Sequence, residues 1–273
     1  MKSNVIPGFG PTLGITLLYI GLVVLIPLSA LVLRAAGMSS DAFITAAFSP
    51  RVMAAYRLSF GAALIAAGAN LILGLLVAWV LVRYQFPGRR LVDAVVDLPF
   101  ALPTSVAGIA LTALYAPKGA IGSILAPLGI KVAYTPLGVV VAMAFIGLPF
   151  VVRTVQPVLQ DIDPELEDAA ASLGANRLAT FRRVLLPILL PALVSGFAMA
   201  FARGLGEYGS VIFIAGNFPG VSEIAPLLIV NRLEQYDTAG ATAIAVVILA
   251  VAFVMLLIIN TIQKWHARRF VAA

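Results

Sequence analysis

The chain has 273 residues, of which 62% are hydrophobic and 11% are charged, and its mean hydropathy is +1.06. A soluble domain carries roughly 25% charged residues, so the composition excludes an ordinary soluble protein and predicts that lipid covers most of the surface. The net charge of +6 is explained by the Lys and Arg residues that are enriched in cytoplasmic loops of membrane proteins, and we do not take it as a sign of nucleic-acid binding. The absence of Cys excludes disulfides, thiol catalysis and Cys-ligated metals.

A helix that crosses a bilayer needs about 20 mainly apolar residues. Six segments meet this requirement, at about 12–33, 58–82, 94–116, 135–157, 188–213 and 239–262. The first segment is longer than the apolar core of a signal peptide, and no small-residue cleavage site follows it, so we expect it to be retained. Because lipid cannot satisfy free backbone groups, we predict an all-α membrane protein, with residues 1–273 forming one domain of six transmembrane helices.

The distribution of Lys and Arg predicts which loops are cytoplasmic. One set of loops and termini contains 11 of the 18 basic residues: Lys2, Arg83, Arg89, Arg90, Arg153, Arg177, Arg182, Arg183, Lys264, Arg268 and Arg269. The other set contains six, and Arg203 lies inside the fifth segment. Both termini and the loop 158–187 are therefore expected in the cytoplasm. Arg51 and Arg57, at the outer end of the second segment, argue against this orientation.

The third segment contains two prolines, and polar residues follow them. Pro99 and Pro103 each remove a helix hydrogen bond, and broken membrane helices occur only where protein or a cavity satisfies the backbone. The hydroxyls of Thr104 and Ser105 are candidates to donate to a passing oxyanion, or simply to repair the kink. Arg153, near the inner end of the fourth segment, is a further pathway candidate, with a headgroup anchor as the alternative.

The loop 158–187 is a polar interruption between two apolar segments. Asp163 is a suitable N-cap, Pro164 is preset for the first helical position, and Gly174 suits a left-handed stop. We therefore predict a helix over 164–173, about 15 Å long. Acidic residues near its start favour the helix dipole: Glu165, Glu167 and Asp168. Asn176 is placed to cap a second helix that leads through Pro187 and Pro191 into the fifth segment.

The predicted helix offers a smooth surface on which another protein can dock. Ala169, Ala170 and Ala171 have small side chains, and Gly174 follows them. The charged groups on either side, including Glu167, Asp168 and Arg177, can orient a partner. The residues alone leave an alternative open, in which the loop lies on the lipid headgroups.

Arg203 and Glu207 are charged residues within the fifth segment, one helical turn apart. Such charges are costly and usually face a pathway or a partner, and the forked N–H donors of Arg suit oxyanions. The alternative is an ion pair that only holds helices together. We expect the pair to line the pathway or gate rather than to form a high-affinity site.

Several catalytic patterns are missing from the sequence. It contains no Gly-x-x-x-x-Gly-Lys-Ser/Thr phosphate loop, no His-Glu-x-x-His and no Gly-x-Ser-x-Gly. The one His, His266, lies in the basic C-terminal tail. We therefore expect no catalytic residues, no metal site and no cofactor in this chain.

The loop also resembles a known cytoplasmic motif. The triplet Asp168-Ala169-Ala170, then Gly174, then Val184-x-Leu186-Pro187 resembles the Glu-Ala-Ala loop of ABC-importer permeases. The resemblance implies a coupling helix that docks on a separate ATPase carrying ATP and Mg²⁺. Its coupling residues would be Glu167, Asp168, Ala169, Ala170, Ala171, Gly174 and Arg177. Asp168 replaces the usual Glu, and Glu167 is then the candidate for the longer side chain.

A narrower resemblance covers nearly the whole chain. The runs 97–108, 146–157, 201–217 and 222–230 resemble the sulfate/thiosulfate permeases, and the T-type subunit best. This implies a type I ABC-importer permease fold in a bacterial inner membrane. It also implies a heterodimer with a second homologous permease, two ATPase subunits and a periplasmic sulfate/thiosulfate-binding protein.

There are three alternatives to a sulfate/thiosulfate permease. Molybdate and tungstate are tetrahedral oxyanions like sulfate, so a permease for them is one alternative. An ion-coupled secondary anion transporter is less favoured, since it usually carries intramembrane acids for coupling and only Glu207 lies well inside a segment. A membrane enzyme has no nucleophile–base or metal constellation to support it.

Overall fold

The computed structural model describes residues 9–271, with side chains for residues 9–261. Within this part the chain is helical and contains no strand, which confirms the predicted all-α class. Lys2 and the side chains of Lys264, His266, Arg268 and Arg269 lie outside the described residues. Five helices in the described part are long and apolar enough to cross a membrane: Phe9–Ala36, Pro50–Arg83, Pro136–Asp161, Arg177–Leu205 and Thr238–Thr261.

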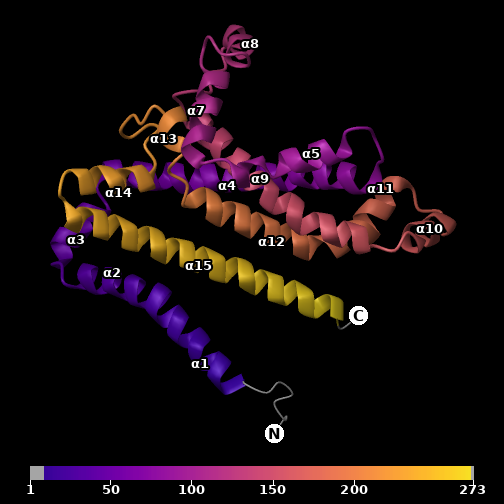
Figure 1. Cartoon of the computed structure of the whole chain (residues 1–273), viewed down its shortest axis with the longest axis horizontal. Coiled ribbons are helices and arrows are strands. Elements are labelled where there is room, and N and C mark those ends of the chain that lie inside the picture. The colour runs from indigo at the N-terminus through magenta and orange to yellow at the C-terminus, as the bar shows by residue number, and fades with distance from the viewer. Residues whose placement is uncertain (1–8, 272–273) are drawn as a thin grey trace.

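The elements follow one another along the chain as shown in Figure 1. They are α1 (Phe9–Ile20), the π-helical turn η1 (Gly21–Leu25), α2 (Ile26–Ala36), α3 (Ser40–Ala47), α4 (Pro50–Arg83), α5 (Arg89–Val96), α6 (Leu98–Ala101), α7 (Thr104–Tyr115), α8 (Gly122–Leu125), the 3₁₀ turn η2 (Ala126–Leu128), α9 (Pro136–Asp161), α10 (Glu165–Ser172), α11 (Arg177–Thr180), the π-helical turn η3 (Phe181–Leu185), α12 (Leu186–Leu205), α13 (Val211–Ile214), α14 (Ala225–Glu234) and α15 (Thr238–Val271).

The core of the bundle is the contact between α4 and α9, which run parallel. The Asn70 amide of α4 donates to the Ala144 carbonyl of α9 at 3.0 Å, and Gly74, one turn later, lies directly against Val151. Two parallel helices must be joined by a chain that returns to its starting side. The segment between Arg83 and Pro136 therefore returns to the end of the bundle where α9 begins; in Figure 1 α5 lies along the bundle toward the α11 end, and α7 projects from it beside α13.

α12 packs antiparallel to α9 at positions where both helices have small residues. Gly196 lies against Val151, whereas Ala200 lies against Gly147, nearer the start of α9. Small residues let helix backbones approach closely when there is no hydrophobic drive between helices in lipid. At Gly147 a Cβ would come within 2.6 Å of the Asn70 amide nitrogen and 3.3 Å of the Ala200 Cβ. The lack of a side chain at Gly147 therefore lets both α4 and α12 pack closely against α9.

We predict that G147L prevents stable folding. The added side chain would enter a space already filled by Asn70 and Ala200, and overpacking of this kind costs about 1–3 kcal/mol or more. G68L is the matched control, because a Cβ at Gly68 of α4 meets no atom within 4 Å. The measurement is monodisperse protein recovered in mild detergent. Equal recovery of the two variants would contradict the assignment of Gly147 to a tight contact.

The predicted third span, 94–116, is not one helix. The structure divides it into α5, α6 and α7, and α7 has only 12 residues, fewer than a complete crossing requires. Leu102 and Pro103 are extended between α6 and α7, because the residue before a Pro disfavours the α conformation. The interruption predicted from the prolines is confirmed, and the count of six crossings stays a prediction.

The fifth helix also differs from the predicted 188–213. It runs unbroken from Arg177 to Leu205, so Pro187 and Pro191 lie within it instead of leading into it. It ends at Gly206, which places Arg203 in the last turn and Glu207 just beyond the helix. Gly204 packs beside Ala63 of α4 and Met143 of α9. Both of these residues lie within their helices, so the end of α12 is still in contact with the bundle.

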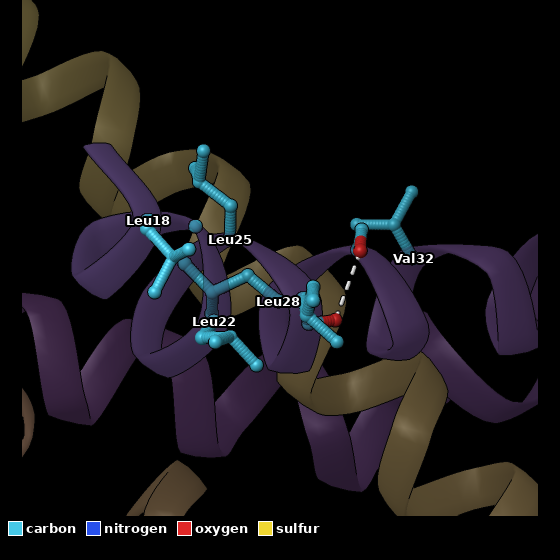
Figure 2. Close-up of a pocket in the computed structure, with 8 residues that line it drawn as sticks. Leu18, Leu22, Leu25, Leu28 and Val32 are labelled. Carbon is cyan, nitrogen blue, oxygen red and sulfur yellow. Dashed lines mark hydrogen bonds between the residues drawn. The ribbon is translucent and has the colours of Figure 1, made fainter. Parts of the chain in front are cut away.

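The first helix lies largely apart from the rest of the chain. None of the residues of α1 and η1 is buried, and in Figure 1 α1 leads away from the bundle below α15. Figure 2 shows an apolar groove along it, lined by residues that include Leu18, Leu22, Leu25, Leu28 and Val32. In a membrane protein such a surface fits lipid tails or another apolar helix.

Candidate coupling loop and translocation residues

The local structure of the 158–187 loop agrees with the prediction. α10 spans Glu165–Ser172 against the predicted 164–173, and the Asp163 carboxylate accepts from the Glu165 N–H at 2.9 Å. Gly174 is left-handed, with φ +81°. The Asn176 side chain accepts from the Ala179 N–H at 2.8 Å and so caps the long helix that begins at Arg177.

The residues of α10 differ in their exposure. Ala170 is buried, at 8% exposure, and Glu167, one turn earlier, forms an ion pair with Arg83 of α4. Leu166 and Leu173, one turn on either side of Ala170, are 43% and 89% exposed. Asp168, Ala169, Ala171, Gly174 and Arg177 are also exposed. The three alanines therefore do not form one exposed surface, because Ala170 turns toward the chain and Ala169 and Ala171, two residues apart, lie on different sides of the helix.

Arg203 and Glu207 form the predicted pair. A guanidinium N–H of Arg203 donates to Oε2 of Glu207, while Oε1 accepts from the backbone N–H of Ser210 at 2.9 Å and from its hydroxyl at 3.0 Å. The Glu207 side chain is 2% exposed and that of Arg203 is 35% exposed. Glu207 is thus fully engaged within the chain, whereas Arg203 keeps a solvent-facing side with N–H donors to spare.

Thr104 lies beside this pair. A Cβ at Gly209 would overlap the Thr104 hydroxyl, so the start of α7 packs directly on the turn between α12 and α13. At Gly108, one turn along α7, a Cβ would come within 2.4 Å of the Ser210 carbonyl oxygen. Ser105 is exposed at the same end of α7. Of the predicted pathway residues, the structure brings together Arg203, Glu207 and Thr104, with Ser105 adjacent.

Arg153 belongs to a separate cluster that joins α9 to α5. Its guanidinium donates to both carboxylate oxygens of Asp97 at 2.8 and 2.7 Å, to Asp93 at 2.6 Å, to the Asp93 carbonyl at 2.8 Å and to Gln156 at 2.6 Å. These bonds use all five N–H donors of an Arg, so none is left for an anion in this conformation. Sequence reasoning missed Asp93 and Asp97, since nothing local indicates a partner 56 or 60 residues away.

We predict that R153A loosens α5 from α9 and lowers the thermal stability of the purified protein. Both aspartates would lose their shared donor, and removing one partner of a hydrogen-bonded charge cluster leaves the others unpaired. R153K keeps a positive charge without the fork and should lose less stability. A melting temperature for R153A equal to that of the unmodified chain would contradict this role.

A further ion pair involves Arg51, one of the two basic residues that argue against the predicted orientation. Arg51 at the start of α4 donates two hydrogen bonds to Glu223, at 2.8 and 2.7 Å, and Asn231 adds a third at 3.2 Å. The Glu223 side chain is 1% exposed. The charge of Arg51, whose side chain is 46% exposed, is therefore paired with a buried carboxylate, although 172 residues separate the partners in sequence.

No group of three His, Cys, Asp or Glu residues that could hold a metal ion occurs in the part of the chain described by the structure. The loop presents small and apolar side chains, and the Arg203 pair presents a partly exposed guanidinium.

The sequence of the chain is similar to that of known transport proteins. Residues 70–272 match the family described as binding-protein-dependent transport system inner membrane component. The sulfate transport system permease protein CysT of Salmonella typhimurium is 52% identical over 270 residues, which covers 99% of this chain and 98% of that protein. The corresponding Escherichia coli protein is 51% identical with the same coverage, and a probable sulfate permease of Nephroselmis olivacea is 54% identical over 249 residues, 91% of this chain and 88% of that protein.

Solved structures show the same fold at low identity. A bacterial ABC transporter that imports the acidic polysaccharide alginate matches with a TM-score of 0.72 and 18% identity, over 93% of this chain and 94% of the matched chain. The same type of transporter in complex with an alginate-bound periplasmic protein matches with a TM-score of 0.73 and 19% identity, over 93% of each chain. The chain belongs to the family of binding-protein-dependent transport system inner membrane components.

Proposed function

We propose that the chain is the transmembrane permease subunit of an ATP-driven ABC importer for sulfate or thiosulfate, and that it forms half of the translocation pathway. The observation that supports this best is the identity of about one half to sulfate permeases over almost the full length of both chains. Transport is the activity of such a subunit, and the hydrolysis of ATP with Mg²⁺ belongs to a partner chain.

The proposed assembly has three kinds of partner. A second homologous permease completes the pathway, two ATPase subunits bind on the inside, and a periplasmic sulfate/thiosulfate-binding protein delivers the anion. The fold shared with a transporter solved together with a periplasmic binding protein supports this arrangement. The exposed residues in and just after α10, which include Asp168, Ala169, Ala171 and Leu173, are the proposed contact with one ATPase.

The proposed location is a bacterial inner membrane, with both termini and α10 in the cytoplasm. In Figure 1 α15 ends toward the side of the bundle where α10 and α11 lie.

The proposed pathway contact is the Arg203 guanidinium. Glu207, held by Ser210, fixes one N–H of Arg203, and the Arg203 side chain, 35% exposed, has further N–H donors for an anion. A mobile contact with a dianion requires donors that are not all satisfied by the protein, which Arg203 provides and Arg153 does not. Thr104 and Ser105 lie where hydroxyls can add to the same contact.

The test is sulfate uptake by vesicles that contain the complete transporter. We expect uptake that requires ATP inside and the external binding protein, and that persists with a proton ionophore. Uptake driven by a proton gradient without ATP would favour an ion-coupled transporter. Competition by molybdate or tungstate but not by thiosulfate would favour the alternative substrates.

A further inference from the structure

Two contacts join the 158–187 loop to a single turn of α4. Arg83, the last residue of α4, forms an ion pair with Glu167 of α10 at 2.5 Å. Trp79 makes an edge-to-face contact with Phe181, with 5.8 Å between ring centroids, and Phe181 opens the turn that leads into α12. Residues four apart share a helix face, so one face of α4 holds both α10 and the start of the next long helix.

The Arg83 guanidinium links the two contacts. Its central carbon lies 5.7 Å from the centroid of the Trp79 ring, within the range of a cation–π interaction. Two nitrogens of Arg83 and one carboxylate oxygen of Glu167 are buried and form no hydrogen bond, so the pair is a charge contact, which salt screens less than an exposed one. Trp79, Arg83, Glu167 and Phe181, here called the α4 clamp, thus form a joint between the loop and the bundle.

Glu167 and Ala170 lie toward the chain, because Glu167 pairs with Arg83 and Ala170 is buried. Other residues of this segment, which include Asp168, Ala169 and Leu173, are exposed. A partner that binds these exposed residues need not displace Glu167 from Arg83.

α4 continues without a break from the clamp to the level of Arg203. Ala63 lies about 24 Å along the helix from Trp79, and its Cβ is 3.7 Å from the position of a Cβ on Gly204, the neighbour of Arg203. A physical connection between two sites needs a contiguous rigid element. α4 supplies one from the loop to the proposed pathway.

We propose that the α4 clamp transmits the movement of α10 to α4, with Arg83 and Trp79 as positioning residues. The inference rests on the proposed docking of α10 on an ATPase. It assigns Glu167 a role inside the chain, where it holds α10 against α4, instead of a contact with the ATPase. Without the clamp α10 moves without α4, so ATP is hydrolysed but little anion is imported.

The test uses proteoliposomes with the complete transporter and measures sulfate imported per ATP hydrolysed. We expect R83Q and E167Q each to lower this ratio by about fivefold or more, the lower end of the usual range for coupling between sites, while ATP hydrolysis continues. The double variant R83E/E167R should restore most of the ratio. R90Q is the matched control, because Arg90 lies just beyond the same helix end, is exposed, and forms no ion pair within the described residues.

The outcomes separate the two proposals. If the unmodified transporter imports no sulfate with ATP, the proposed function fails. If it does import and R83Q matches R90Q, the clamp is not the joint and the inference is overturned. A double variant as uncoupled as the single ones also overturns it, since Glu167 would then act on a different partner. E167Q keeps the shape of the side chain and tests the same pair should R83Q fail to assemble.

Discussion

Replacing Gly174 with Val is expected to abolish most transport while leaving membrane insertion intact. Gly174 has φ +81°, and a Cβ there meets no atom within 4 Å, so the substitution acts through the backbone alone. β-branched residues tolerate positive φ poorly, and a strained backbone position costs about 1–3 kcal/mol. The chain would leave α10 in another direction and carry the docking face away. Uptake normalised to membrane abundance is the measurement.

G174N is the matched control for this change. Asn enters the left-handed region more readily than other residues with a side chain, so G174N should retain much of the transport that G174V loses. Full transport by G174V would count against docking through α10. Equal loss in both variants would show that the side chain, not the backbone, disturbs the loop.

R203A is expected to reduce both protein stability and sulfate uptake. It leaves the Glu207 carboxylate, 2% exposed, without its charge partner, and breaking a buried pair in this way costs about 3–5 kcal/mol. The double variant R203A/E207A removes the uncompensated charge and should recover protein level. Uptake should stay low in the double variant, because the guanidinium proposed to face the anion is still missing.

R232A provides the control for the Arg203 experiment. Arg232 pairs with Asp237 at 2.8 Å, but both side chains are about one third exposed, and pairs near the surface contribute about 0–1 kcal/mol. R232A should therefore leave level and uptake nearly unchanged. Unchanged uptake in R203A at normal protein level would show that the pair does not line the pathway. Full uptake in R203A/E207A would make it purely structural.

The sequence predicted well those features that depend on neighbouring residues. The helix start at Asp163, the left-handed Gly174 and the Asn176 cap involve groups within four residues of each other, so their chemistry can be recognised directly. The long apolar helices follow from composition for the same reason. The break at Leu102 and Pro103 was also visible, because Pro restricts the residue before it.

Features that depend on tertiary contacts were missed or placed wrongly. The helix through Pro187 and Pro191 continues although Pro usually ends a helix, and its end at Leu205 was placed eight residues too late by apolarity alone. The partners of Arg51, Arg83 and Arg153 come from distant parts of the chain, up to 172 residues away in sequence. Charge pairing across a bundle leaves no local pattern, so only the fold reveals it.

Cross-linking from α10 tests the central claim most directly. Because the chain has no Cys, a single cysteine at Leu173, 89% exposed, gives a unique attachment point, and one at Leu18, 65% exposed on the first helix, serves as the control. In membranes that contain the whole transporter, a cross-linker at position 173 should capture the ATPase subunit, and one at position 18 should not. Capture of lipid alone at position 173 would contradict this proposal, because α10 would then lie on the membrane surface and would not contact the ATPase subunit.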